Sequence, residues 1–298
     1  MNVNIKILFA LIAAIGLTCS VNAFAQEDAK IEATQVRGGI YMLTGQGGNI
    51  GLFIGDDGSF MIDDQFAPLT DKIIAAVRSV GGDTPKYLIN THFHGDHTGG
   101  NENLGKAGTL IMSHHEVRER LVNGYFIGAF GMKSPPAGDA ALPTLTYADN
   151  LHLHINDDTV RVIHVPSAHT DGDSFVVFEK ANVVHAGDLV FNGFYPFVDG
   201  ANGGSVRGMI AGVDRILALT NDDSKIIPGH GPLASRTDLQ AYRDMLATAY
   251  ERLLKLKNEG LSAEDAIVNK PLRDLEQRWG GGIFSGDKWI SLVYPAVY

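Results

Sequence analysis

Residues 90–101 read Asn-Thr-His-Phe-His-Gly-Asp-His-Thr-Gly-Gly-Asn, a run that places four metal-ligating side chains within six positions. Residues 86–90 before it are mostly apolar and predict a buried strand that ends where the histidines begin. In an extended turn, His92 and His94 point one way, whereas Asp96 and His97 point another. Ligands packed this closely cannot all reach one ion in relaxed geometry, so the run favours two adjacent metal ions that need further ligands.

Three later positions offer those ligands. His169, Asp188 and His230 each follow an apolar segment that predicts a strand. Loops at strand ends commonly build the sites of α/β proteins. One loop histidine is more often a solvated surface residue, but four strand-end segments carrying seven histidines and aspartates predict a metal centre. The remaining histidines are interpreted as surface or structural residues: His114, His115, His152, His154, His164 and His185.

The rest of the chain predicts two similar halves, each with a sheet that faces the other and helices outside. In the first half, we expect a hairpin turn at 55–58 and Ser113 as the N-cap of a helix through Leu121. The strands expected there are 40–43, 49–54, 59–62, 87–90 and 109–112, with a helix at 69–80. The second half predicts strands 151–155, 159–165, 174–179, 182–185 and 225–227, and helices 205–219 and 237–257.

Residues 122–137 are apolar, rich in glycine and without clear periodicity. This composition predicts a mobile flap beside the centre, and a docked irregular segment is the alternative. We expect Phe126, Phe130 and Met132 of this segment to form an apolar wall of the substrate pocket.

The order of the ligands resembles the five-motif signature of the metallo-β-lactamase fold hydrolases. His92-x-His94-x-Asp96-His97, then His169, Asp188 and His230, match it across most of the chain, and Asp63 resembles the early aspartate of that family. The resemblance implies a four-layered αββα sandwich, of α/β (α+β) class. It also implies that His92, His94 and His169 bind one metal, that Asp96, His97 and His230 bind the second, and that Asp188 bridges them. Asp63 would orient the ligand loop by hydrogen bonds.

Five imidazoles and two carboxylates without a thiolate favour two Zn²⁺ ions, although carboxylates also accept Mn or Fe. Metal binding lowers the pKa of water to about 7, which supplies hydroxide at neutral pH. We expect a bridging hydroxide, held by Asp96 and Asp188, to attack a substrate carbonyl. Two readings of another class remain: a mononuclear iron persulfide dioxygenase, and a zinc-binding protein without catalysis.

The substrate is less constrained than the chemistry. Asp188 together with His97 resembles the glyoxalase II, lactonase and esterase branch, so we expect an ester, thioester, lactone or amide. A β-lactamase is the alternative, because residues 168–173 resemble the lactamase spacing. Residues 191–200 are expected at the cleft mouth, with Asn192 or Tyr195 donating to a substrate oxyanion. A packed aromatic corner is the alternative for this segment.

The first 25 residues resemble a cleavable secretory signal, with Lys6, an apolar run at 7–17 and the Ala23-Phe24-Ala25 end. The run is too short for a membrane helix, which needs roughly 20 residues, so we expect no stable membrane anchor. Cleavage after Ala25 would remove Cys19 and leave a single domain, 26–298, with a helical C-terminal tail, in the periplasm or secreted. Without Lys6 the formal charge falls from −10 to −11. With no basic run, this charge disfavours nucleic acid and leaves a small-molecule substrate as the expected partner. The sequence does not indicate the oligomeric state.

Overall fold

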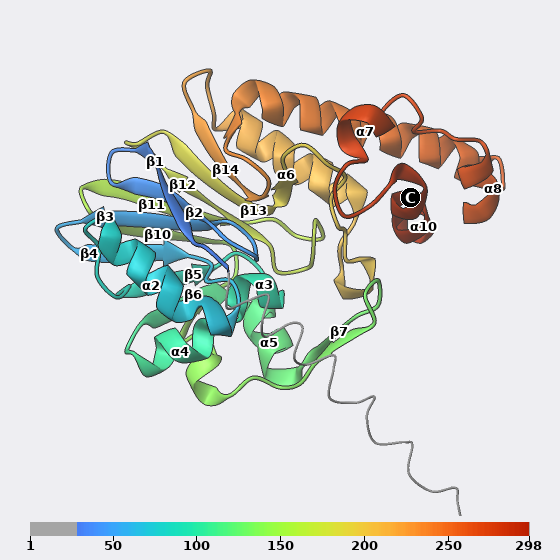
Figure 1. The fold of residues 1–298 in the computed structure, drawn as a ribbon. Coiled ribbons are helices and arrows are strands. Elements are labelled where there is room, and N and C mark those ends of the chain that lie inside the picture. The colour runs from blue at the N-terminus through green and yellow to red at the C-terminus, as the bar shows by residue number, and fades with distance from the viewer. Residues whose placement is uncertain (1–28, 298) are drawn as a thin grey trace, which may run out of the picture.

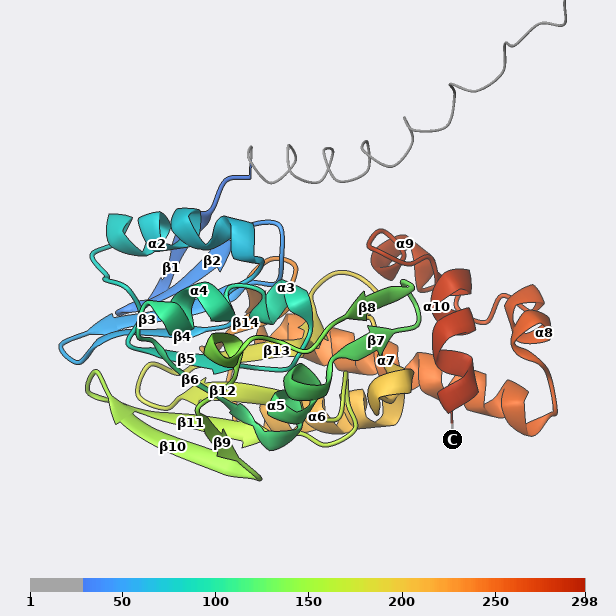
Figure 2. The same ribbon diagram turned by 90° about the horizontal axis from the view of Figure 1, so that it is seen from below.

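The computed structural model describes residues 29–297 (Figure 1). The expected signal segment, with Cys19 and Ala25, lies outside these described residues. Two sheets face each other, and helices cover the outer face of each (Figures 1 and 2).

The first half forms a seven-stranded sheet in the order β1-β2-β3-β4-β5-β6-β9. Its first four strands are antiparallel, and β4, β5, β6 and β9 run parallel. The strands are β1 (Glu32–Arg37), β2 (Ile40–Thr44), β3 (Ile50–Gly55), β4 (Gly58–Ile62), β5 (Tyr87–Asn90), β6 (Leu110–His114) and β9 (Leu145–Tyr147). The helical elements are η1 (Ala67–Leu69), α2 (Thr70–Ser79), α3 (Gly95–Thr98), α4 (Asn101–Lys106), α5 (His115–Asn123) and η2 (Asp139–Ala141).

The second half forms a six-stranded sheet in the order β10-β11-β12-β13-β14-β15. Only β13 and β14 are parallel in this sheet. The strands are β10 (Asn150–Ile155), β11 (Asp158–His164), β12 (Ser174–Phe178), β13 (Val183–Phe191), β14 (Lys225–His230) and β15 (Ala234–Ser235). The helical elements are η3 (Gly200–Asn202), α6 (Val206–Ala218), α7 (Arg236–Asn258), α8 (Ala263–Val268), α9 (Glu276–Trp279), α10 (Gly286–Val293) and η4 (Tyr294–Ala296).

Alternating side chains divide the apolar core into layers. On β12, Val176 and Phe178 pack between the two sheets, whereas Phe175 and Val177 pack with the helices of the second half. This is the period of two that a strand buried on both faces requires. A third apolar layer joins the first sheet to α2 and α4. The four layers therefore run helix, sheet, sheet, helix, and the αββα prediction is confirmed.

Three local expectations were wrong. Asp188 lies inside β13 instead of after a strand, because β13 continues to Phe191 through register shifts against β14. Ser113 belongs to β6, and the His114 side chain caps α5 by accepting from the backbone N–H of Glu116. Residues 122–137 are not simply irregular, since they contain the hairpin of β7 (Tyr125–Ile127) and β8 (Met132–Ser134).

The C-terminal helices pack on the second half of the chain. Trp289 is fully buried and stacks on Tyr195 with ring centroids 5.2 Å apart, and its indole N–H donates to the carbonyl of Pro196. Trp279 is also buried in the same apolar cluster. Both tryptophans therefore serve the internal packing of this chain. Among the residues that the structure describes, no helix combines the length and apolar character needed to cross a membrane.

Candidate metal centre

The seven predicted ligands meet at one edge of the sandwich, in two groups. The first ligand group is His92, His94, His169 and Asp188, and the second is Asp96, His97 and His230. Within each group, the ligand atoms lie within 4.8 Å of one another. The structure thus brings together every residue that the sequence proposed as a metal ligand.

The parallel strands place these side chains. The loop after β5 carries His92 and His94 into α3, where Asp96 and His97 lie on the first turn. In the second sheet, β13 pairs with β14, so Asp188 and the last residue of β14, His230, become neighbours. The carboxyl ends of parallel strands share one edge of a sheet, which is why ligands distant in sequence converge here.

Asp188 lies between the two ligand groups. Its Oδ2 is 3.4 Å from His169 Nε2 and 3.5 Å from His230 Nε2. Its Oδ1 is 3.1 Å from His97 Nε2. One carboxylate therefore reaches nitrogens of both groups, as a bridging ligand must.

Several nitrogen atoms point at one another in a way that a cation would explain. His94 Nδ1 lies 2.9 Å from His169 Nε2, and His97 Nε2 lies 3.3 Å from His230 Nε2. His92 Nε2 is buried and has no hydrogen-bond partner within residues 29–297. Converging lone pairs and an unpartnered imidazole nitrogen fit divalent metal ions held by nitrogen and oxygen ligands.

Outer hydrogen bonds orient the ligands of the metal centre. The Asp63 carboxylate accepts from the Thr91 hydroxyl at 2.7 Å and from His97 Nδ1 at 2.8 Å. Because the Thr91 hydroxyl donates to Asp63, His92 Nδ1 donates to the Thr91 oxygen, 3.1 Å away. The Nε2 atoms of His92 and His97 are left free for metal, which fits the orienting role expected for Asp63.

The first ligand group has a similar partner that the sequence reasoning missed. Asp199 accepts from His94 Nε2 at 3.0 Å, so that His94 turns its Nδ1 towards the centre. Asn202 donates to the same Asp199 oxygen at 2.7 Å and to the backbone carbonyl of Phe126 at 3.0 Å. The only sequence signal was that Asp199 is the penultimate residue of the segment 191–200, which was expected at the cleft mouth. Its partner, 105 residues away, could not be inferred.

Two glycines permit the close packing around the ligands. A Cβ atom at Gly229 would lie 2.0 Å from Asp188 Oδ1, and one at Gly48 would lie 2.1 Å from the His97 ring. Either methyl group would displace a ligand, so the backbone itself forms part of the wall of the centre.

Protonation in the metal centre follows burial and charge. Burial disfavours the charged form of Asp188, but the nearby His97 and His230 outweigh it and hold its pKa well below the usual range. Burial lowers the pKa of His169 to about 4 and that of His92 well below its usual value. An ionised carboxylate beside neutral imidazoles is the protonation state that binds metal. In the second ligand group burial is outweighed by Asp188, and the pKa of His230 rises to about 9, so metal binding there must displace a proton.

The predicted pocket residues fall into different places. Tyr195 is fully buried on Trp289, and burial raises its pKa, so it cannot serve at the cleft mouth; here the packed corner is correct. Asn192 borders the second ligand group, since its backbone N–H donates to the His230 carbonyl, while its side chain donates to the Pro232 carbonyl. Phe130 contacts Phe197, which stacks on His94.

Phe126 does not face the metal centre. Residues opposite each other in an antiparallel pair share a face, so Tyr125, Ile127 and Met132 lie on one side of the β7–β8 hairpin and Phe126 on the other. The Tyr125 ring lies 4.7 Å from the Phe93 ring within the ligand loop, which identifies the inner face. The strand alternation therefore corrects the expectation that Phe126 lines the pocket.

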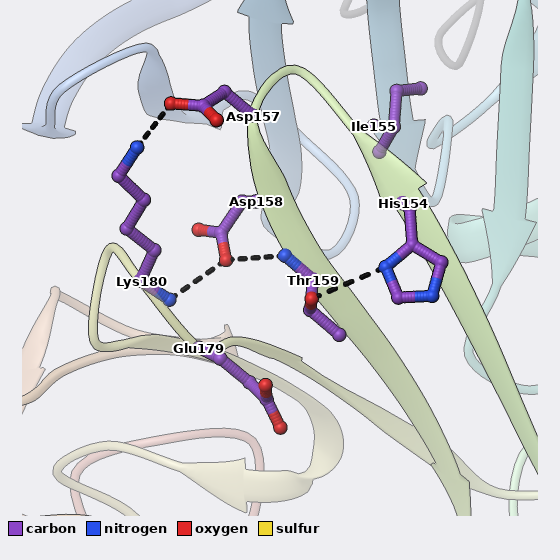
Figure 3. Close-up of a pocket in the computed structure, with 7 residues that line it drawn as sticks. All are labelled: His154, Ile155, Asp157, Asp158, Thr159, Glu179 and Lys180. Carbon is purple, nitrogen blue, oxygen red and sulfur yellow. Dashed lines mark hydrogen bonds and ion pairs between the residues drawn. The ribbon is translucent and has the colours of Figure 1, made fainter.

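A surface hollow at the other end of the sandwich has a structural explanation (Figure 3). It lies where β11 begins, at Asp158, whereas the His169 loop follows the end of that strand. Asp158 accepts from the backbone N–H groups of Thr159 and Lys180, both at 2.7 Å, and Asp157 pairs with the Lys180 side chain. These contacts hold two turns together, and we assign no ligand to them.

Facing sheets with histidine and aspartate ligands at a shared edge define a class of αββα metal-binding proteins. The sequence profile of the metallo-beta-lactamase superfamily matches residues 43–230, and the chain belongs to that superfamily. The resemblance inferred from the sequence motifs is thus confirmed.

Relatives of known activity match part of the chain. A hydroxyacylglutathione hydrolase from Nitrosococcus oceani is 28% identical over 170 residues, covering 55% of each protein. The acyl-coenzyme A thioesterase MBLAC2 of Bos taurus is 23% identical over 172 residues, covering 52% of this chain and 59% of the relative. The chain therefore spans little more than half the length of these curated relatives.

Solved structures share the fold at low identity. A metallo-beta-lactamase from Pontibacter korlensis gives a TM-score of 0.60 at 16% identity, covering 73% of this chain and 99% of the other. The sec-alkylsulfatase Pisa1 from Pseudomonas sp. gives 0.60 at 17% identity, covering 80% and 45%. At such identities, the likeness concerns the fold.

Proposed function

We propose that this protein is a dinuclear zinc hydrolase that cleaves an ester or thioester. His92, His94 and His169 would hold one ion, Asp96, His97 and His230 the other, and Asp188 would bridge them. The position of Asp188 between both ligand groups, 3.4 Å from His169 and 3.1 Å from His97, carries this proposal. Mn or Fe are the alternative metals, because two of the seven ligands are carboxylates.

When bound, two such ions lower the pKa of water and polarise a carbonyl. The chain supplies position and charge. Asp96 and Asp188 stay ionised, since neighbouring histidines outweigh burial and lower the pKa of each. Each carboxylate would accept a hydrogen bond from the attacking water or hydroxide. The first ligand group would face the carbonyl oxygen of the substrate, and the second would face the leaving group. Asp63 and Asp199 keep the histidine rings in these orientations.

The relatives favour the thioester or ester among possible substrates. One is named a hydroxyacylglutathione hydrolase and the other an acyl-coenzyme A thioesterase, and both names describe thioester cleavage. We place the protein in the periplasm or outside the cell, on the sequence of residues 1–25. Signal-peptide removal in a cell fractionation would test this location.

The test is metal analysis combined with a substrate panel. Purified protein should bind close to two zinc ions per chain and hydrolyse a short acyl thioester and ester. Hydrolysis of nitrocefin alone would favour the β-lactamase alternative. Oxygen consumption with a persulfide, at one iron per chain, would favour the dioxygenase. Zinc binding without turnover of any substrate would leave the non-catalytic alternative.

A further inference from the structure

An aromatic cluster joins the first ligand group to the C-terminal segment. Phe197 stacks on His94 with ring centroids 5.7 Å apart and lies 5.6 Å from His169. Phe130 lies 5.0 Å from Phe197, and Phe284 lies 6.1 Å from Phe130 and 6.2 Å from Phe197. Three segments distant in sequence therefore form one aromatic cluster that contacts two metal ligands, and within it Phe197 and Phe284 are buried.

Apolar side chains close in sequence to members of this cluster are exposed to solvent. Phe130 is 44% exposed at the hairpin turn, Met132 is 53% exposed on the inner face of the hairpin, and Ile283 is 56% exposed beside Phe284. Figure 2 shows the tip of the β7–β8 hairpin close to α9 and α10, between which Ile283 and Phe284 lie. We call Phe130, Met132, Phe197, Ile283 and Phe284 the apolar mouth.

We propose that the apolar mouth binds an alkyl acyl chain of the substrate. Large apolar side chains that stay open to solvent next to a site usually bind an apolar group. The apolar mouth reaches the first ligand group through Phe197. In the proposed function this group faces the carbonyl, and we therefore assign the occupant of the mouth to the acyl side. The inference rests on the proposed function and adds its substrate class: acyl esters or thioesters with an extended alkyl chain.

The inference also gives the C-terminal segment a role. Residues after His230 lie outside the part matched by the superfamily profile, yet Ile283 and Phe284 complete the apolar mouth. Buried Phe284 fixes the position of the segment by contact with Phe130 and Phe197, while exposed Ile283 meets the ligand. Substrate selection is thus built from a hairpin and a C-terminal loop that lie about 150 positions apart in the chain.

A series of p-nitrophenyl esters from acetate to octanoate, with zinc-loaded full-length protein, tests the acyl site. We expect kcat/KM to rise about two- to fourfold per added methylene. Ile283→Asn and Met132→Gln should flatten this rise, because each replaces an apolar side chain of the mouth with a polar amide. Phe126→Ser is the matched control, because Phe126 is also 53% exposed but lies on the outer face of the hairpin.

The outcomes separate this inference from the proposed function. Two results would overturn the acyl site without contradicting the proposed hydrolase activity. One is a kcat/KM that does not change with acyl length in the parent protein, and the other is a loss of the length dependence in Phe126→Ser equal to that in Ile283→Asn. A rise that follows alkoxy length and not acyl length would overturn the assignment to the acyl side. If neither an ester nor a thioester is hydrolysed, the proposed function fails, and fluorescence binding of dansyl-labelled undecanoate to metal-free protein still decides the site. Binding there should weaken at least about tenfold in Ile283→Asn and not in Phe126→Ser.

Discussion

The two ligand groups differ in enclosure. In the first, the side chains of His92, His169 and Asp188 are 1%, 0% and 5% exposed. In the second, Asp96 and His230 are 29% and 21% exposed, although His97 is buried. The first group is held from behind by Asp199 and a backbone carbonyl, and the second by Asp63. We infer that the first group is the rigid position and the second the open one.

Loss of the carboxylate shared by both groups should have the largest effect. Asp188→Asn removes the charge that joins them, so we expect bound zinc to fall from two ions to one or fewer. Since several kcal/mol of charge stabilisation is lost, kcat/KM should drop about a thousandfold or more. Plasma emission spectroscopy and ester hydrolysis would check this. Asp157→Asn, at the far end of the sandwich, is the control that should leave metal content unchanged.

The open group should lose its ion first. On titration with a zinc chelator, we expect half of the metal to leave well before the rest, because the second group exchanges with solvent more readily. Asp96→Asn should abolish that early phase and retain one ion. Release of both ions in a single phase, in the parent protein, would contradict the proposed difference between the groups.

The two outer carboxylates should act on different groups. Asp63 contacts His97 directly and reaches His92 only through Thr91, so Asp63→Asn should weaken metal binding mainly by the second group. Asp199→Asn should weaken binding by the first group, and each effect should be about 10- to 100-fold. The chelator titration distinguishes the two: the early phase should shift in Asp63→Asn and the late phase in Asp199→Asn. If both variants shift the same phase, the assignment of partners to groups is wrong.

A histidine pair outside the metal centre should give the smallest effect, a loss of fold stability in acid. The rings of His114 and His164 stack with centroids 3.6 Å apart and planes 4° apart. Burial, then the facing His164, lowers the pKa of His114 to about 4, from an ordinary 6.5. The folded state therefore binds this proton less readily than the unfolded state. Its contribution is present above pH 6.5 and is lost as the pH falls from 6.5 towards 4.

Acid titration can compare metal release by the two ligand groups only at pH values where the protein stays folded. The His114–His164 pair helps to set the lower end of that pH range. Discounted for partial exposure, the loss in unfolding free energy should be about 1 to 2 kcal/mol. Urea unfolding of metal-free protein at pH 7 and pH 5 would measure it. His114→Asn keeps an N-cap acceptor and should reduce the dependence. The parent must be compared with His114→Asn because burial also raises the pKa of Asp173 to about 7. That shift stabilises the folded state as the pH falls from 7 to 5, opposite to the effect of His114, and it is present in both the parent and the variant. Equal slopes would refute the assignment.

Most of the fold was predictable from local pattern, because apolar alternation and glycine turns act over a few residues. The hairpin turn at 55–58 and the strand at 87–90 were correct to within a residue. The ligand set was recognisable because metal chemistry restricts residue types at strand ends. By contrast, Asp199 on His94, and Phe284 on Phe130, depend on packing between distant segments, which periodicity does not encode. The prediction that Tyr195 lies at the cleft mouth was wrong for the same reason, because Tyr195 packs against Trp289, which is distant in the sequence.

The seven ligands come from both halves of the chain: four from the loop and helix after β5, and three from the second sheet and its loops. A bound ion would therefore link the two halves of the chain, and its binding free energy would add to the free energy of unfolding. The lifetime of the folded chain would then follow the supply of metal in its surroundings. When metal is scarce, the protein would lose both its activity and the link between its two halves. The temperature at which it unfolds would then report how much of the metal centre is occupied.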